Sequence, residues 1–143
     1  MSQKFPYTKS EINDVLLPLT RKIAASKIKG KTLIIGIQGG QGTGKTTLVH
    51  YLRHRLRAKG YKVSSFSIDD FYTSAKSRKQ LTKKYPHNPF YSIARGLFGT
   101  HRTKELTKTF LKIRNGKSFE IPVFDKSLLN AYGDISPRTI KIK

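Results

Sequence analysis

A run of eight residues holds the clearest chemistry in this chain of 143 residues. Residues 39–46 match the pattern G-x-x-x-x-G-K-[ST], in which glycines let backbone N–H groups turn inward toward phosphate oxygens. We expect Lys45 to reach the β- and γ-phosphates of a nucleotide, and the hydroxyl of Thr46 to ligate Mg²⁺. The expected nucleotide-binding set is Gly39, Gly40, Gln41, Gly42, Thr43, Gly44, Lys45, Thr46 and Thr47.

A pair of adjacent carboxylates, Asp69 and Asp70, is the second candidate for chemistry. The pair follows an apolar alternation over residues 61–68, which is typical of a strand. Ligands of open α/β sheets bind beyond the carboxyl ends of the strands, so the pair should face the phosphate loop. One carboxylate is then placed to accept the proton of an attacking hydroxyl, and the other to hold Mg²⁺-bound water. The alternative is an ordinary loop or cap carboxylate.

These two motifs need a framework of strands and a crossover helix. Residues 33–38 are almost wholly apolar, as expected of a strand that is buried on both faces of a parallel sheet. Leucines four residues apart predict a helix over residues 46–59, with Gly60 as its stop. With the strand over 61–68, these segments predict a right-handed βαβ unit. The predicted fold class is therefore α/β: a P-loop type of parallel sheet, short and incomplete, flanked by helices.

The remaining elements are read from periodicity and breakers. Residues 8–29 predict a helix that Thr8 and Glu11 cap and that Pro18 kinks or divides. A further helix is predicted over 103–114, an extended segment over 119–124, and the beginning of a strand over 139–143. We interpret the chain as one domain, in which residues 1–30 form a helical extension and residues 31–143 bind nucleotide and acceptor.

The composition limits the function classes. Cysteine is absent, which excludes disulfides, zinc–thiolate sites and thiol catalysis and fits a cytoplasmic location, and no apolar run could cross a membrane. The net charge of +21 suits anionic small molecules but also leaves nucleic acid as a partner. For nucleic acid, the candidate residues are the basic run Lys76, Arg78, Lys79, Lys83 and Lys84 with the nearby aromatics Tyr85, Phe90 and Tyr91. A solvated loop is the simpler interpretation of that run.

Four segments together resemble a known family. The phosphate loop, residues 69–72, residues 95–101 and residues 122–127 are similar in order and spacing to the D-glycerate 3-kinase family. That family belongs to the P-loop small-molecule kinases, with uridine kinase, phosphoribulokinase and pantothenate kinase. The chain departs from the family pattern at Phe98, where proline is usual, and at Arg102, where aspartate is usual.

The resemblance implies a fold, an activity and site residues. It implies ATP and Mg²⁺ as ligands and a small, hydroxyl-bearing, glycerate-like acceptor. In this interpretation Asp69 is the catalytic base, Lys45 is the catalytic lysine that contacts the phosphates, and Thr46 and Asp70 are the residues at the metal. The acceptor-side residues that it implies are Asp70, Tyr72, Arg95, His101, Asp125 and Lys126. A non-catalytic nucleotide-binding module is the alternative. The family pattern continues for longer than these 143 residues, so we expect a second polypeptide or self-association to complete the sheet.

Overall fold

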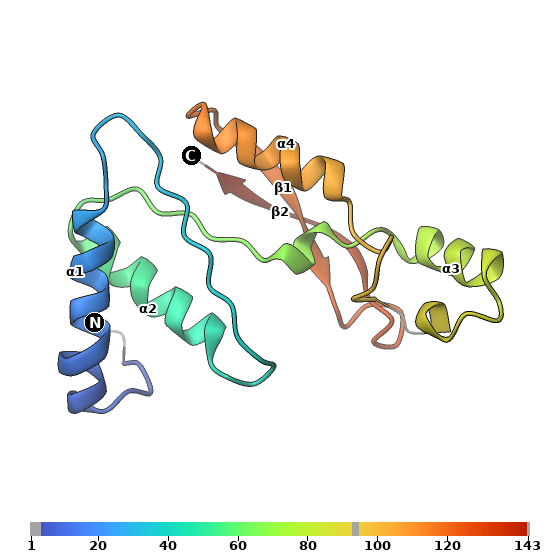
Figure 1. Cartoon of the computed structure of the whole chain (residues 1–143), viewed down its shortest axis with the longest axis horizontal. Coiled ribbons are helices and arrows are strands. Elements are labelled where there is room, and N and C mark those ends of the chain that lie inside the picture. The colour runs from blue at the N-terminus through green and yellow to red at the C-terminus, as the bar shows by residue number, and fades with distance from the viewer. Residues whose placement is uncertain (1–3, 93–94, 143) are drawn as a thin grey trace. The chain divides into compact units, whose positions relative to one another are not determined.

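The computed structural model describes residues 4–92 and 95–142 (Figure 1). The chain divides into two compact units, Met1–Ser65 and Phe66–Lys143, which are described separately. Within the described residues, no helix is long and apolar enough to cross a membrane.

The first unit begins with a capped and divided helix. The Glu11 N–H donates to Thr8 Oγ1 (3.2 Å) and the Thr8 N–H donates to Glu11 Oε2 (2.7 Å), which confirms the predicted capping box. The helix runs as a π-helical segment η1 (Glu11–Leu16) and then as α1 (Leu17–Ala25), with Pro18 in the first turn of α1. Proline has no N–H to donate, so the predicted division at Pro18 is confirmed.

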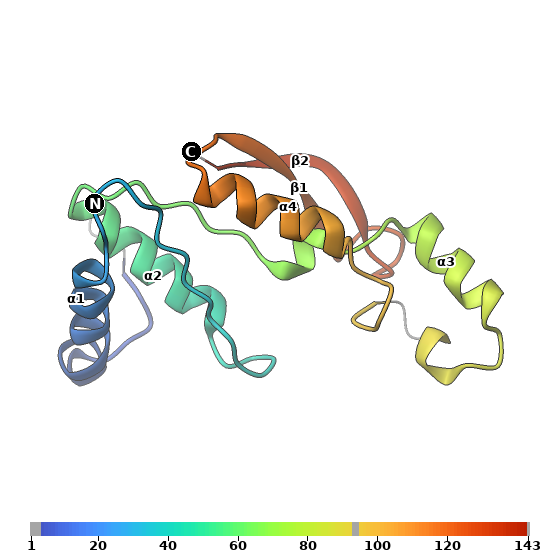
Figure 2. The same ribbon diagram turned by 45° about the horizontal axis from the view of Figure 1, so that its top comes forward.

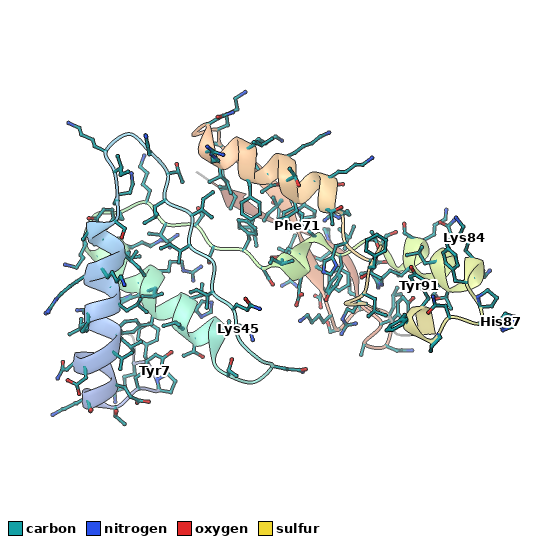
Figure 3. The ribbon with its side chains drawn as sticks, in the orientation of Figure 1. Tyr7, Lys45, Phe71, Lys84, His87 and Tyr91 are labelled. Atoms are coloured by element: carbon teal, nitrogen blue, oxygen red, sulfur yellow. The ribbon has the colours of Figure 1, made fainter. Side chains whose placement is uncertain are left out.

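Helix α2 (Lys45–Ala58) packs on the first helix around aromatic side chains. Its core contains Leu16, Tyr51 and Leu52. The Tyr51 ring meets the edges of Phe5 and Tyr7, with ring centroids 5.2 and 5.8 Å apart. Tyr7 is labelled in Figure 3, beside the first helix. The chain leaves α2 through Gly60 at φ +84°, which confirms the predicted helix and its stop.

The two predicted parallel strands are not strands in the structure. Residues 33–38 and 61–67 form no strand-to-strand hydrogen bonds, and Ile35 is 45% exposed. An apolar run becomes a parallel strand only when neighbouring strands supply its hydrogen bonds, and among the described residues none do. In place of a neighbouring strand, a side chain of α2 bonds to the backbone of residues 61–67: Arg57 Nε donates to the Val63 carbonyl (3.1 Å). The prediction of a parallel βαβ unit is therefore wrong for this structure.

The second unit is built on an antiparallel hairpin. Strand β1 (Phe119–Asp125) pairs with β2 (Asp134–Ile142), the register shifting between Pro122 and Phe124 because proline cannot donate to the ladder. The predicted extended segment is confirmed, and the C-terminal strand begins earlier than predicted. Helix α4 (Thr103–Arg114), which coincides with the predicted helix, runs alongside the hairpin (Figure 2).

A short helical turn and a polar helix complete this unit. The 3-10 turn η2 (Ile68–Phe71) contacts β1 and α4, and its Phe71 is buried. Helix α3 (Ala75–Lys84) is followed by the 3-10 turn η3 (Pro89–Ser92). Hydrophobic periodicity did not predict α3, because its buried side chains are Ala75 and a charged one, Arg78.

Candidate functional site

The phosphate loop has a compact, local conformation. Gly42 and Gly44 have φ values of +78° and +79°, a region that side chains other than glycine rarely adopt. The loop opens α2, whose first residue is Lys45, so the N-terminal N–H groups of a helix lie next to the glycines. This is the arrangement expected of a loop that holds phosphate.

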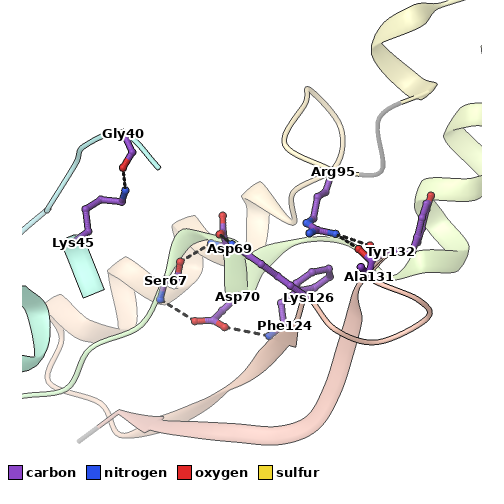
Figure 4. A network of polar contacts seen from close by, with 10 residues as sticks. All are labelled: Gly40, Lys45, Ser67, Asp69, Asp70, Arg95, Phe124, Lys126, Ala131 and Tyr132. Carbon is purple, nitrogen blue, oxygen red and sulfur yellow. Dashed lines mark hydrogen bonds and ion pairs between the residues drawn. The ribbon is translucent and has the colours of Figure 1, made fainter. Parts of the chain in front are cut away.

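Contacts within the loop involve only residues 39–46. The Thr43 hydroxyl donates to the Gly40 carbonyl (2.8 Å), and Lys45 Nζ donates to the same carbonyl (Figure 4). A Cβ at Gly39 would lie 2.9 Å from Thr43 Oγ1, so glycine is required there for the close approach. The side chain of Lys45 therefore folds back over a loop in which Gly42 and Gly44 are left-handed and Gly39 is closely approached by Thr43.

The loop also offers an oxygen ligand for a cation. Thr46 lies exposed in the first turn of α2, and Thr47 follows it half-buried. Mg²⁺ prefers hard oxygen ligands and keeps several waters, so one hydroxyl beside bound phosphates suits it. No cluster of three acidic, histidine or cysteine side chains occurs in the part of the chain that the structure describes. One threonine hydroxyl, together with the phosphate oxygens of a nucleotide and water, thus fits a Mg²⁺ ion that binds with the nucleotide.

In the second unit, Asp69 is accessible and paired with a lysine. Ser67 caps η2, its Oγ accepting the Asp69 N–H at 3.1 Å. The Asp69 carboxylate lies 2.6 Å from Lys126 Nζ, and its side chain is 35% exposed (Figure 4). Two predicted site residues that are far apart in the sequence are therefore in contact.

Asp70 points the other way and is 8% exposed. One of its oxygens accepts the Ser67 N–H (2.8 Å) and the other accepts the Phe124 N–H (3.1 Å). These bonds fasten η2 to β1, which favours a structural role for Asp70. Its predicted role in holding Mg²⁺ or the acceptor stays a prediction that this geometry does not support.

Tyr72 and His101 form the aromatic side of the cluster. They make an isolated antiparallel bridge, and their rings lie 4.2 Å apart. Burial, followed by the charge and hydrogen bond of Asp69, raises the pKa of Tyr72. Burial lowers the pKa of His101, against a smaller opposing effect of Asp69. A neutral hydroxyl and a largely neutral imidazole therefore lie beside the Asp69 carboxylate.

The remaining predicted residues lie on the turn that follows β1 or contact it. Arg95 Nη1 donates to the Ala131 and Tyr132 carbonyls, both at 2.9 Å (Figure 4). Asp125 accepts the Ser127 N–H and hydroxyl and pairs with Arg138 at 2.6 Å, and these contacts, led by the Ser127 hydroxyl, lower the pKa of Asp125. The carboxylate of Asp125 is thus occupied by Ser127 in the following turn and by Arg138 on β2.

Comparison with known families begins with the N-terminal half of the chain. Residues 10–77 match the model of the methylmalonyl Co-A mutase-associated GTPase MeaB family, and this matched segment includes the phosphate loop. This match covers the nucleotide-binding motif but not the acceptor-side residues beyond 77.

Individual relatives extend the similarity. The chain is 40% identical over 110 residues to the uncharacterized kinase mug58 of Schizosaccharomyces pombe, covering 76% of this chain and 39% of the relative. It is 34% identical over 106 residues to the chloroplastic D-glycerate 3-kinase of Arabidopsis thaliana, which covers 71% of this chain and 23% of that relative. The solved D-glycerate 3-kinase of Cryptococcus neoformans superposes with a TM-score of 0.68 at 28% identity, covering 90% of this chain and 45% of that one. Bacterial uridine kinases also match.

The chain belongs with the P-loop small-molecule kinases. It spans less than half of the length of the Schizosaccharomyces pombe and Arabidopsis thaliana relatives. Its helices and small sheet represent a part of the α/β fold of these kinases.

One departure of the chain from the family pattern has a structural explanation. Arg102, where aspartate is usual, donates from Nη2 to the Asp70 carbonyl (2.9 Å) and from Nε to the Tyr72 carbonyl (3.2 Å). It therefore braces the turn that carries Asp69. Neither hydrophobic periodicity nor a motif indicated this contact.

At one further residue, the structure contradicts both interpretations of the basic run, the solvated loop and the nucleic-acid surface. Arg78 belongs to the basic run predicted for nucleic acid, but it is 2% exposed and donates to backbone carbonyls. A guanidinium buried in this way cannot follow a phosphate backbone. The signal that could have found it is a lone arginine on a helix whose only large apolar side chain is Leu81.

Proposed function

We propose that the protein transfers the γ-phosphoryl group of ATP to a hydroxyl of a small anionic metabolite of the glycerate type. The observation that carries the proposal is the phosphate loop, with its two left-handed glycines, its glycine-only close approach at Gly39 and Lys45 folded over it. The similarity to kinases, two of them D-glycerate 3-kinases, supports phosphoryl transfer and favours ATP over GTP.

On the nucleotide side, the chain supplies N–H groups and one ammonium. The loop N–H groups and the start of α2 bind the phosphates, and Lys45 leaves the Gly40 carbonyl to contact the β- and γ-oxygens. Thr46 is the ligand for Mg²⁺, which neutralises phosphate charge when it is bound. These contacts hold the phosphates and neutralise their charge.

On the acceptor side, Asp69 is the general base. The acceptor hydroxyl oxygen forms a bond to the γ-phosphorus as the bond to the bridging oxygen of ADP breaks, and the hydroxyl proton passes to the Asp69 carboxylate. Lys126, 2.6 Å from that carboxylate, and the Tyr72 hydroxyl orient it. The exposure of Asp69 leaves a hydroxyl access to it.

The charges of this region favour an acceptor that carries a carboxylate. Lys126 pairs with the base, and the charge of Arg95 acts on Tyr72, which bonds to the base; charged donors of this kind fix and orient a carboxylate. His101 adds a polar ring beside Tyr72. D-glycerate is therefore the first acceptor to test.

The test is phosphoryl transfer by the purified full chain with Mg²⁺-ATP. We expect ADP release that depends on D-glycerate and a phosphorylated product visible by ³¹P NMR, with GTP as the comparison nucleotide. Other hydroxy acids, sugars and nucleosides define the acceptor class. ATP binding without turnover on any acceptor would instead establish a nucleotide-binding module.

A further inference from the structure

A left-handed turn between β1 and β2 carries unusual backbone strain. Leu129, Asn130 and Ala131 have φ values of +53°, +54° and +65°, followed by Gly133 at +78°. A left-handed conformation costs free energy at each residue that is not glycine, and three such residues in succession require compensation from their surroundings. Part of that compensation lies within the turn, where the Tyr132 N–H donates to the Leu129 carbonyl (3.2 Å) and the Gly133 N–H donates to the Leu128 carbonyl (2.8 Å).

Further bonds come from outside the turn, from a buried arginine on α3 that reaches the end of the turn. Arg78 Nη1 donates to the Thr73 carbonyl, and its Nη2 donates to the carbonyls of Tyr132 (3.0 Å) and Gly133. Its guanidinium carbon lies 5.1 Å from the Phe124 ring and 4.8 Å from the Tyr132 ring. The planar fork thus joins the start of α3, the end of β1 and the end of the left-handed turn.

The same contacts lead directly to the proposed acceptor side. The Phe124 ring meets the edge of Tyr72, with centroids 5.0 Å apart, and the Tyr72 ring lies tilted against His101, with centroids 4.2 Å apart. Arg95 rests on the turn through the Ala131 and Tyr132 carbonyls. Lys126, two residues after Phe124, pairs with Asp69. Tyr72 and Arg95 are therefore two contacts from Arg78, through Phe124 and through the Tyr132 carbonyl, and His101 is three contacts away.

We infer that Arg78 is a positioning residue for phosphoryl transfer. It holds the left-handed turn and the Phe124 ring in the arrangement that aims Arg95, Lys126 and Tyr72 at the acceptor. Because it is buried, it acts through these groups and does not touch the acceptor itself. The catalytic part of this inference rests on the proposed function, whereas the structural part does not.

Lysine cannot replace arginine in this role. An ammonium is a single point of charge, whereas the guanidinium donates from two terminal nitrogens to three carbonyls and stacks between two rings. Arg78→Lys therefore keeps the positive charge but removes the planar group that bonds to three carbonyls at once. Arg78→Met keeps the apolar stem and removes both. Arg114→Lys, at the exposed end of α4, is the matched control.

The experiment compares these variants with wild type in two measurements. With D-glycerate and Mg²⁺-ATP, we expect Arg78→Lys to lower kcat and to raise the acceptor KM, together by about tenfold or more in kcat/KM, with the KM for ATP unchanged. By NMR titration, we expect the pKa of His101, which faces Tyr72 and Asp69, to rise toward its ordinary value as this ring contact loosens and water enters.

A rescue variant separates positioning from simple loss of stability. Ala131→Gly relieves strain in the turn, so in the Arg78→Lys background it should restore part of kcat/KM and of the His101 titration. If Arg78→Lys matches Arg114→Lys in both measurements, the inference is wrong. If wild type shows no turnover on any acceptor, the proposed function fails, while the His101 titration still decides the role of Arg78.

Discussion

The phosphate loop and the acceptor-side cluster are built over different distances along the chain. In the loop, Thr43 and Lys45 bond to the Gly40 carbonyl, three and five residues away. In the cluster, Asp70 bonds to a residue 54 positions away, and Arg78 to one 55 positions away. A short motif can therefore specify the loop, whereas the cluster exists only after distant segments have packed.

The two regions also differ in burial, and this separates binding from stability. The glycines and Thr46 of the loop are exposed, so substitutions there should change ligand affinity more than folding. Asp70, Tyr72 and Phe124 are buried, so substitutions there should change the free energy of unfolding as well. Measurements of turnover, ligand affinity and unfolding can therefore probe the two regions separately.

The largest effect is expected at the proposed base. Asp69→Asn keeps the side-chain size but removes the proton acceptor, so turnover should fall by about 10²–10⁴-fold while ATP affinity stays within about twofold. Steady-state ADP release and calorimetric ATP titration measure the two quantities. Glu120→Gln makes the same acid-to-amide change on an exposed strand position and should leave both unchanged. Undiminished turnover in Asp69→Asn would remove this carboxylate from the chemistry.

In the loop, Lys45→Ala should weaken ATP binding and leave folding intact. Loss of a charge-assisted phosphate contact costs about 1.5–3 kcal/mol, which is roughly a 10- to 100-fold rise in the dissociation constant. Titration calorimetry with Mg²⁺-ATP measures the constant, and a thermal melt checks the fold. Lys59→Ala, an exposed lysine after α2, is the control. An ATP affinity equal to that of wild type would contradict the phosphate-loop assignment.

Asp70→Ala should show the opposite pattern from Lys45→Ala. It leaves the Phe124 N–H and the Ser67 N–H without their acceptor, which costs about 1–3 kcal/mol of unfolding free energy. Urea denaturation measures that loss, and ATP affinity should not change. Asp14→Ala, an exposed acid on η1, provides the comparison. If Asp70→Ala melts like wild type and instead loses Mg²⁺-dependent ATP binding, Asp70 is a metal ligand after all.

The smallest effect is a pH dependence at His101. Burial lowers its pKa in the folded state below the ordinary value of about 6.5, so the unfolded chain binds the proton more readily. This residue therefore costs no stability above about pH 7.5 and destabilises the fold as the pH falls through 6.5. His101→Gln should lessen the drop in melting temperature between pH 7.5 and 5.5. An equal drop in both proteins would contradict the burial of His101.

Lower pH tests a second group in the same unit. The pKa of Asp125 is lowered by Ser127 and Arg138, so its stabilising contribution is present above about pH 4 and is lost as the pH falls below that value. Because this window lies below that of His101, melts between pH 7.5 and 5.5 report on the histidine.

Local sequence patterns predicted much of the fold. The capping box of Thr8 and Glu11, the helix over 103–114 and the stop at Gly60 were all confirmed. Each depends on contacts within about one helical turn. The strands predicted over 33–38 and 61–68 were wrong, because apolar character alone does not supply a hydrogen-bonded neighbour.

The sequence by itself determined the phosphate loop, because glycine spacing, Lys45 and the helix that follows lie within one short segment. It also marked Asp69, Tyr72, His101 and Lys126 as candidates, and the structure places these four together. Only the tertiary structure decided that Asp70 is buried and accepts the Phe124 N–H, and that Arg78 is buried and donates to the Tyr132 carbonyl. The physical reason is that the surroundings of a carboxylate or a guanidinium are set by partners more than 50 residues away. Residue type and spacing carry no information about such partners until the chain has folded.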